Sequence, residues 1–461
     1  MPGLQQKKNV ARRHPGLAEL ADGRHADGPP LFSLKSSLVS PRFGIVKELS
    51  PVEADPTEPG RPFVIHAALA NHRFLPDDQA GQFSASGKGF TVERASERAL
   101  GEAVERYSAS FWWPEEIRRA RRTDLPGRTL DPRALVLYDP AQYHDLPYPP
   151  YRDDSMLGWV QAHSLTRGDS IWIPALSAFL TYPATEQELL WPATSNGLAA
   201  GPTLADAVLG AALEVIERDA VMIGWLNRVY RERWEASSHP SPEIRELVEA
   251  YRRRGVEVGL FRMPTDVEEV YVFLAIARQP HARPAAVVGL GADYDAATAA
   301  GKAIAEIAQV RPALRRKLRR EETRQRLDEL HRDPRLVTSL HDHDLLYAHE
   351  ASLPKLDFLF SGSVSVSEWP EKGTASTIAD LVTALGRCGH ELIYCNLTVP
   401  DMERFNLFTA RAIIPGFQPI DFGWKERRLG GPRIYELPVT LGLLRQPNTL
   451  ETLNPDPHPI A

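Results

Sequence analysis

Two pairs of glutamates, each with its members three residues apart, occur in otherwise apolar stretches of the chain. Each pair is followed at once by an arginine, and the two copies are Glu102–Arg106 and Glu214–Arg218. In a helix, residues three apart project from the same face, so the carboxylates of a pair repel each other. A half-buried acid pair needs a counter-charge, and Mg²⁺ binds carboxylates together with substrate phosphates. The repeated pattern indicates a metal site, whereas one pair alone would fit a solvated acidic face.

A third segment combines an acid, an amide and a guanidinium group within two helical turns. Glu306, Gln309 and Arg311 provide these groups. Arginine is suited to bidentate capture of phosphate oxygens. The segment therefore extends the predicted metal site toward an anion such as a nucleotide, with a polar surface stripe as the alternative.

A lysine in a small-residue loop precedes the first acid-bearing segment. The loop is not a Walker motif, because Gln82 stands where the first glycine is required and Gly89 where Ser or Thr should follow Lys88. Gly289-Leu290-Gly291 lacks the third glycine of a dinucleotide fingerprint. Lys88 can still approach an anion near the N-terminus of the helix that follows. From the residues alone we predict a nucleotide and metal site, without a defined reaction.

Three helices must position these side chains. Apolar spacing predicts them over residues 91–111, 204–226 and 295–310. Small-residue loops are predicted at 81–89 and 195–203, before the first two helices, and strand-like runs occur elsewhere. Alternating strands and helices predict an α/β or α+β fold.

Composition limits the classes of protein that fit. The 461 residues are 43% hydrophobic, and the formal net charge is −6, so charge favours neither nucleic acid nor a membrane surface. We expect no membrane span and no secretory signal, and the two cysteines predict reduced thiols of a cytoplasmic protein. The basic stretch 315–326 also carries acids, so a solvated helix face is favoured there over nucleic-acid binding.

The ordered set of motifs resembles the YcaO family. The matching segments are Ser86–Gly89, Glu102–Arg106, Ser195–Gly201, Glu214–Arg218, Glu306–Arg311 and, as a C-terminal signature, Ile414–Pro419. The resemblance covers residues 38–461, which predicts one YcaO domain after a flexible arm at 1–37. It implies mixed sheets packed with helices around a nucleotide cleft.

The resemblance also implies the cofactors and the site residues. Such proteins use ATP, with Mg²⁺ held by carboxylates, to activate an amide oxygen. The implied metal ligands are Glu102, Glu105, Glu214, Glu217 and, as an additional ligand, Asp206. The implied nucleotide-binding residues are Ser86, Lys88, Asn196, Arg218, Glu306, Gln309 and Arg311. Pro202 departs from the family pattern, because many relatives have Asn there.

The proline-rich tail points to one branch of the family. Pro455–Pro459 is similar to the ending of azoline-forming cyclodehydratases, which convert Cys, Ser or Thr of a precursor peptide to thiazolines or oxazolines. That likeness implies catalytic positions at Pro457, Pro459 and the carboxylate of Ala461. We expect the tail to fold back to the nucleotide cleft. Without the family match, a disordered tail that is bound by another domain would be favoured.

Partners follow from the same resemblance. The residues before Ser40 are too few for a fused ThiF-like domain, so a separate ThiF-like protein that binds the leader of the precursor peptide is expected. A flavin dehydrogenase acting downstream and a homodimer are also compatible with the family. The alternatives are a thioamide-forming or macroamidine-forming YcaO protein and a non-catalytic scaffold of the same fold. The scaffold is disfavoured because all four paired glutamates are intact.

Overall fold

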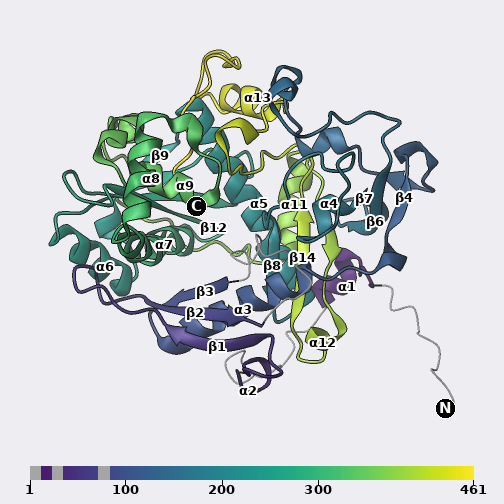
Figure 1. Cartoon of the computed structure of the whole chain (residues 1–461), viewed down its shortest axis with the longest axis horizontal. Coiled ribbons are helices and arrows are strands. Elements are labelled where there is room, and N and C mark those ends of the chain that lie inside the picture. The colour runs from purple at the N-terminus through teal and green to yellow at the C-terminus, as the bar shows by residue number, and fades with distance from the viewer. Residues whose placement is uncertain (1–11, 23–34, 71–83, 461) are drawn as a thin grey trace.

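The computed structural model describes residues 12–22, 35–70 and 84–460, which form three β-sheets with helices packed between and around them (Figure 1). The expectation of mixed sheets combined with helices is therefore confirmed. In the described part of the chain, no helix combines the length and the apolar character needed to cross a bilayer. Besides the three helices discussed below, the α-helices are α1 (Leu17–Asp22), α2 (Lys35–Leu38), α4 (Ala175–Ala178), α6 (Pro242–Arg252), α8 (Glu321–Arg332), α9 (Leu340–Tyr347), α10 (Asp357–Phe360), α11 (Ile378–Arg387), α12 (Pro400–Glu403) and α13 (Arg433–Thr440).

The first sheet leads into the helix that carries the first acid pair. Its strands pair antiparallel in the order β1 (Val46–Pro51), β2 (Phe63–Leu69), β3 (Ser84–Gly89). Helix α3 (Val92–Ala109) starts directly after β3, and the Thr91 side chain caps it by accepting a hydrogen bond from a backbone N–H group of the first turn. Gly87 lets α3 lie close to β3, because a Cβ atom there would be 2.1 Å from the Ala95 carbonyl oxygen.

The second sheet repeats this arrangement with the third helix. Its strands are antiparallel in the order β12 (Ala286–Asp293), β11 (Tyr271–Arg278), β10 (Glu257–Arg262), β9 (Glu232–Trp234). Helix α7 (Ala296–Lys317) follows β12 and is capped by the Asp295 side chain. A Cβ atom at Gly289 would lie 2.2 Å from the Ala303 carbonyl oxygen of α7. Glycine is thus required at equivalent places in β3 and β12 for close packing of strand and helix.

The third sheet carries the second acid-bearing helix. Its path is β5 (Arg128–Thr129), β7 (Asp169–Pro174), β6 (Leu157–Ser164), β13 (Ile393–Asn396), β14 (Phe408–Ile413), β8 (Leu198–Gly201), and β4 (Arg118–Ala120) pairs with β6. The β5–β7 pair is parallel and the other pairs are antiparallel. Helix α5 (Leu204–Asn227) follows β8 and is capped by Thr203.

A strand, a polar cap and a helix therefore recur three times, and the three helices agree with those that the sequence predicts. The small residues at 81–89 and 195–203 predict loops, but Ser84–Gly89 and Leu198–Gly201 are strands. Small side chains lower strand propensity, yet here they let a helix pack directly onto the strand. Residues 81–83 lie outside the described part of the chain.

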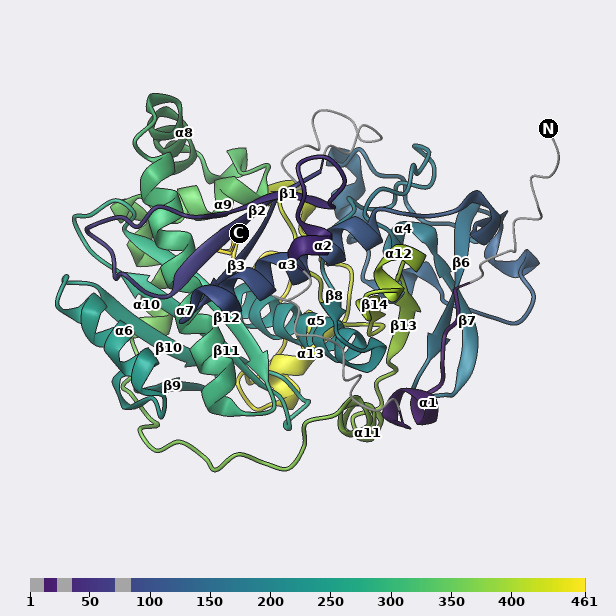
Figure 2. The ribbon, with the colours of Figure 1, turned by 90° about the horizontal axis from the view of Figure 1, so that it is seen from below.

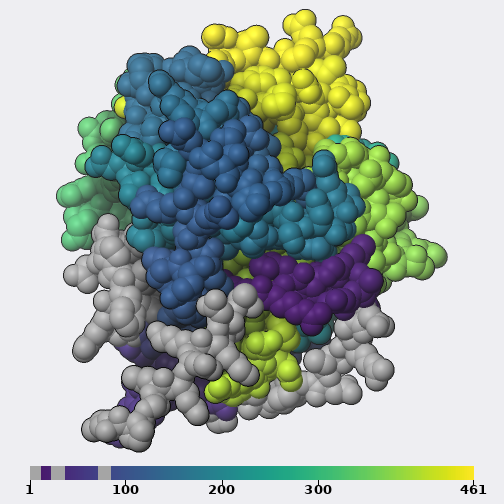
Figure 3. Space-filling view, turned by 90° about the vertical axis from the view of Figure 1, so that its right-hand side faces the viewer, coloured from purple at the N-terminus to yellow at the C-terminus, as the bar shows by residue number. Residues whose placement is uncertain are grey.

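The N-terminal segment differs from the expected flexible arm. Residues 12–22 lie along the surface, and Figure 3 shows this purple segment between blue and yellow-green parts of the chain. The Arg12 guanidinium donates to the Phe111 backbone oxygen (2.8 Å), and its side chain is only 5% exposed. The Tyr394 hydroxyl donates to a backbone carbonyl of the same segment. The other parts of the expected arm, 1–11 and 23–34, lie outside the described residues.

A buried ionic network fastens α5 to α13. Arg433 bonds the Asp219 carboxylate at 2.9–3.0 Å and the Asp266 carboxylate at 2.6–3.1 Å. His390 lies 2.7 Å from Asp266, and the Gln418 backbone N–H donates to Asp219 (2.7 Å). Asp219 directly follows the second acid motif, so the network holds that part of α5 in place.

Replacing Arg433 by Met should destabilise the fold strongly. The change leaves Asp219, whose side chain is 0% exposed, beside Asp266 without their shared cation. Removing one partner of a buried ion pair costs about 3–5 kcal/mol of unfolding free energy. Chemical denaturation would measure the loss, and the exposed Arg404→Met is the matched control, expected to change stability by less than about 0.5 kcal/mol.

The pH dependence of this loss tests whether charge pairing causes it. Burial alone would raise the pKa of Asp266, but hydrogen bonds from His390 and Arg433 hold it well below its usual range. The stabilisation is therefore complete above the unfolded-state pKa of about 4 and is lost as pH falls through the lower folded-state pKa. The difference between wild type and Arg433→Met should shrink in acid. A difference independent of pH would contradict an electrostatic origin.

Candidate functional site

A polar pocket of about 330 Å³ lies where the three strand–helix units meet. Helices α3, α5 and α7 approach it from different sheets, and both ribbon views show them grouped at the centre of the molecule (Figures 1 and 2). Predicted site residues that line it are Ser86, Lys88, Glu102, Asn196, Glu214, Arg218, Glu306 and Gln309. Side chains more than 200 residues apart in the sequence thus form one site.

Two of the pocket glutamates are held by equivalent hydrogen bonds. The backbone N–H of Ser86 in β3 donates to Glu102 of α3 (2.9 Å), and the backbone N–H of Leu290 in β12 donates to Glu306 of α7 (2.7 Å). In both cases strand residue and glutamate are 16 positions apart. Gln309 then donates to the Ser86 hydroxyl (2.7 Å), which joins the two units.

Three other glutamates lack sufficient counter-charge. Burial, together with Glu214 and Glu102, raises the pKa of Glu105 well above its ordinary value. Burial also raises the pKa of Glu214 to about 7, against the opposing effect of Arg218, and raises that of Glu217. In the described part of the chain, no hydrogen-bond donor reaches Glu105 or Glu217 at bonding distance. Glu105 is influenced by Glu214 and Glu102, whereas Glu217 is influenced by Glu306, and among the described residues these glutamates do not form a group of three whose oxygens all lie within 4.8 Å of one another. Carboxylate oxygens are nevertheless the ligands that a hard divalent cation such as Mg²⁺ prefers.

Cationic and amide groups on the same pocket fit a phosphate. Lys88 Nζ lies 3.7 Å from Glu306, and burial lowers the pKa of this lysine although Glu306 opposes the shift. Arg218 lies 3.7 Å from Glu214 and 3.8 Å from Glu217. Among the described residues, Arg218 Nε and Asn196 Oδ1 are buried without a hydrogen-bond partner. Buried polar atoms of this kind call for a ligand or water, so the pocket fits a metal–nucleotide complex.

Arg411 is a site residue that the sequence did not reveal. It extends from β14, is 4% exposed, and donates to the backbone carbonyls of Ala178 (3.3 Å), Thr194 (2.9 Å) and Asn196. Its positive charge opposes the burial-driven rise in the pKa values of Glu105 and Glu214, which remain raised overall. Arg411 therefore holds the loop before β8 and partly offsets the acids. The available signal was a single arginine within an apolar strand.

Four predicted metal-binding or nucleotide-binding residues do not line the polar pocket: Glu105, which lines only the apolar pocket described below, Glu217, Asp206 and Arg311. Asp206 and Arg311 have other partners. Asp206 is in the first turn of α5, where it bonds the capping residue Thr203 (2.6 Å). At 1.5 Å per residue it lies about 12 Å along the helix from Glu214. Arg311 is 1% exposed and bonds Glu58 (3.0 Å), because two residues beyond Gln309 correspond to about 200° of helix rotation. The structure gives both residues structural roles.

The proline-rich tail is packed inside the protein, as expected, and does not extend into solvent. Pro457 and Pro459 are buried, whereas Ala461 lies outside the described residues. The Tyr347 hydroxyl donates to the Pro457 carbonyl (2.7 Å). Both ribbon views place the end of the described tail near α9 (Figures 1 and 2), whose first residue, Leu340, lines the polar pocket.

A second, largely apolar pocket of about 600 Å³ adjoins the polar one. The two share Ser86, Arg98 and Glu102, and Glu105 also lines the apolar pocket. Its apolar wall is formed by Val104, Ala199, Ala200, Pro202, Phe405 and Leu407. A ligand with one charged and one flat apolar end would fit the two pockets together.

Comparison with known sequences finds one family model and two distant curated relatives. The family model described as YcaO cyclodehydratase, ATP- and Mg²⁺-binding, matches residues 86–418. An uncharacterised protein of Methanothermobacter thermautotrophicus is 31% identical over 229 residues, which are 49% of this chain and 56% of the relative. An uncharacterised protein in the tfuA 3′ region of Rhizobium leguminosarum bv. trifolii is 28% identical over 243 residues, 49% of this chain and 54% of the relative. The chain spans about half the length of these relatives.

Solved structures share the fold at low sequence identity. A heterocyclase in complex with substrate and cofactor has a TM-score of 0.76 at 24% identity and covers 94% of this chain and 57% of its own. YcaO from Methanopyrus kandleri, bound with AMPPCP and Mg²⁺, has a TM-score of 0.59 at 21% identity, covering 87% and 90%. The E. coli microcin synthetase McbBCD complex with pro-MccB17 bound gives 0.53 at 15% identity, covering 79% and 86%.

The matched residues 86–418 include β3, β8, β12 and the three acid-bearing helices that build the polar pocket. The family they define binds ATP and Mg²⁺, in agreement with the carboxylates and cations that the pocket brings together. The chain belongs to the YcaO family.

Proposed function

We propose that this chain uses ATP and Mg²⁺ to close thiazoline or oxazoline rings at Cys, Ser or Thr residues of a ribosomally made peptide. The observation that carries the proposal is the polar pocket, where the Glu306 carboxylate lies beside Lys88 and the Glu214 carboxylate, whose pKa is raised to about 7, lies beside Arg218. The heterocyclase and the nucleotide-bound YcaO protein with the same fold support it.

The paired glutamates would hold the metal. Glu105, Glu214 and Glu217 have raised pKa values and too little counter-charge, so a divalent cation would relieve their mutual repulsion. Both carboxylate oxygens of Glu102 already accept hydrogen bonds, one from the Ser86 backbone N–H and the other from the Arg106 guanidinium. Glu102 is therefore less available to bind a metal ion. We therefore assign the first three as the principal ligands and Glu102 as a supporting one.

The two adjoining pockets would divide the nucleotide between them. Lys88, Arg218 and Asn196 would bind the phosphates, because their polar atoms line the pocket that the acids share. The hydrogen bond from Gln309 of α7 to Ser86 of β3 would hold together the two elements that form one wall of the polar pocket. The apolar pocket has room for the base.

The chemistry follows from amide activation. When bound, Mg²⁺–ATP supplies the γ-phosphoryl group that makes the amide oxygen a leaving group. A substrate side chain adds to the preceding carbonyl carbon and gives up its thiol or hydroxyl proton. The carbonyl oxygen takes the γ-phosphoryl group and departs as phosphate, and the amide nitrogen loses its proton. The peptide becomes one water lighter for each ring. Lys88 and Arg218 would stabilise negative charge on the transferring group, since both are held in a buried, low-dielectric site.

The buried tail favours ring formation within the family. A proline-rich linker for another domain would be solvated, whereas Pro457 and Pro459 are buried. We propose that these prolines act by holding the tail in an extended form at low entropic cost. Thioamide or macroamidine formation is the alternative, and the products distinguish them.

A separate leader-binding protein is part of the proposal. The E. coli microcin synthetase of similar fold is a complex of several proteins with its peptide bound. We propose that a ThiF-like partner delivers the precursor peptide to this chain.

Glu105→Gln and Glu217→Gln should each abolish function without unfolding the protein. Either change removes a charge from the metal site while keeping side-chain size, so turnover should fall about 10²- to 10³-fold, the scale on which single electrostatic groups act in catalysis. The melting temperature without Mg²⁺ should stay the same or rise, because repulsion is removed. The increase in melting temperature on adding Mg²⁺ and AMPPCP should disappear.

The matched control is Glu93→Gln, an exposed acid in the first turn of the same helix α3. It should keep both turnover and ligand-induced stabilisation. If Glu217→Gln retained near-normal turnover and the stabilisation by Mg²⁺ and AMPPCP, the metal assignment would be wrong.

Mass spectrometry of the product tests the reaction class. With the leader-binding partner, precursor peptide, ATP and Mg²⁺, each ring should remove one water and release one phosphate. Omitting the partner should nearly stop the reaction, because leader capture lies elsewhere. Replacement of oxygen by sulfur in the product would identify a thioamide-forming enzyme instead, and ring formation on a leaderless peptide at full rate without the partner would contradict the two-protein scheme.

A further inference from the structure

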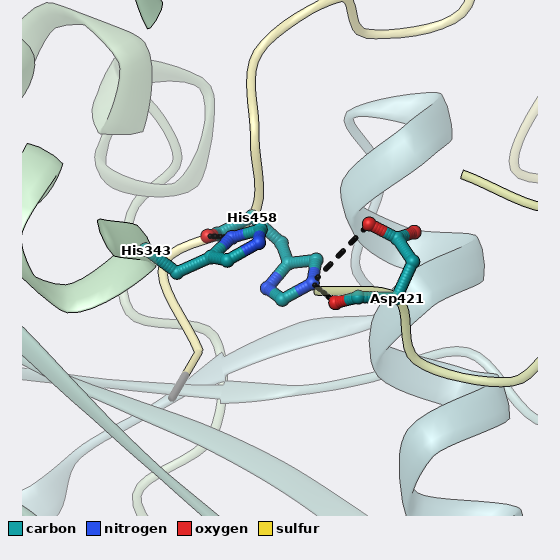
Figure 4. A group of neighbouring side chains, drawn as sticks. All are labelled: His343, Asp421 and His458. Carbon is teal, nitrogen blue, oxygen red and sulfur yellow. Dashed lines mark hydrogen bonds and ion pairs between the residues drawn. The ribbon is translucent and has the colours of Figure 1, made fainter. Parts of the chain in front are cut away.

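Two histidines and an aspartate meet where the tail enters the interior (Figure 4). His343 comes from α9, Asp421 from the segment before α13, and His458 from the tail. As whole residues they are 0%, 6% and 2% exposed, respectively. We refer to these three residues as the tail clasp.

The tail clasp is held by directed hydrogen bonds. His458 Nε2–H donates to the Asp421 backbone oxygen (2.6 Å), and His343 Nδ1–H donates to the His458 backbone oxygen (2.7 Å). The Ile460 backbone N–H donates to His458 Nδ1 (3.3 Å). These partners require a neutral His458 ring. Burial lowers the pKa of His458 well below its usual value, and the charges of His343 and Arg218 lower it further, in agreement with a neutral ring.

Other donors complete the seat for the tail backbone. Proline has no N–H group, so a stretch with alternate prolines presents mainly carbonyl oxygens. Trp424 donates to the Pro455 carbonyl (3.1 Å), and Trp225 donates to that of Asp456 (2.9 Å). With Tyr347 and His343 on the next two carbonyls, four successive carbonyls have a side-chain donor.

The geometry of the tail clasp does not suit a metal ion. One donor atom from each residue lies within 4.8 Å of the others, a grouping that a metal could use. The two imidazole rings, however, are stacked with centroids 3.9 Å apart and planes 14° apart. Lone pairs in nearly parallel ring planes do not converge on one ion, and the hydrogen bonds already use both nitrogens of His458. A zinc site needs three or four convergent donors.

The tail clasp lies behind the wall of the polar pocket. Asp421 stands between Ile420 and Phe422, which both line that pocket. His343 is three residues after Leu340, which lines it as well. We propose that His458 is a positioning residue that clasps the tail to this wall and thereby sets the tail end beside the bound nucleotide. The inference rests on the proposed function, since it assigns the tail a part in that reaction.

Variants of the clasp residues separate positioning from simple filling of space. His458→Leu still fills the buried space with an apolar side chain but loses the hydrogen bonds to Asp421 and Ile460. His458→Gln, in contrast, retains an N–H donor at a similar distance from the backbone. Losing such buried hydrogen bonds should lower the population of the seated tail about 10- to 100-fold. We expect kcat to fall at least about tenfold for His458→Leu and for His343→Leu, with little change in the KM for ATP, and to be largely restored in His458→Gln.

Three further measurements decide the proposal. The double variant His343→Leu/His458→Leu should lose no more activity than either single variant, because both residues act through one clasp. Hydrogen exchange over residues 450–460 should accelerate in His458→Leu and not in His341→Leu, an exposed histidine of the same helix. Metal analysis of the purified protein should find no stoichiometric zinc.

The outcomes separate this inference from the proposed function. If the wild type forms no azoline but exchange in the tail still depends on His458, the proposed function fails and the clasp stands. Unchanged exchange and unchanged kcat in His458→Leu would overturn the clasp. Losses that multiply in the double variant, or one zinc per chain that disappears in His458→Leu, would also overturn it.

Discussion

Electrostatic repulsion among half-buried carboxylates is the constraint on which the rest of the structure depends. Glu105 lies on α3 and Glu214 and Glu217 lie on α5, and burial raises the pKa of each of them. Lys88, Arg218 and Arg411 offset only part of this charge, since the pKa values of the three glutamates are raised even in the presence of these cations. A bound cation would offset the remaining repulsion, and part of its binding free energy would then compensate the cost of bringing the acids together.

The fold keeps this unfavourable cluster together through rigid supports around it. Glycines in β3 and β12 bring α3 and α7 directly onto their strands. The Arg433 network fixes α5 immediately after its acid motif. Arg411 ties the loop before β8 to the central strand β14. Helix propensity alone is too small to oppose the repulsion between like charges on these helices. The packing of each helix against its sheet must therefore supply the stabilising free energy.

Much of the site was predictable because local spacing determines which side chains share a helix face. Glu102 with Glu105 and Glu214 with Glu217 follow directly from their three-residue spacing. Arg311 was assigned to the nucleotide from its motif, but helix rotation turns it to Glu58. Asp206 was expected to be a ligand, yet its position in the first turn makes it part of a cap. Arg411 and His343 depend on contacts between distant segments, which no local pattern encodes, and the small-residue strands were mistaken for loops because tertiary packing overrides strand propensity.

The most direct measurement is a crystal structure with AMPPCP in which Mn²⁺ replaces Mg²⁺, so that anomalous scattering locates the metal. The account predicts anomalous peaks among Glu105, Glu214 and Glu217, with the phosphates against Lys88 and Arg218. Peaks at another place, such as the tail clasp, or a nucleotide bound with those glutamates left free of metal, would contradict it.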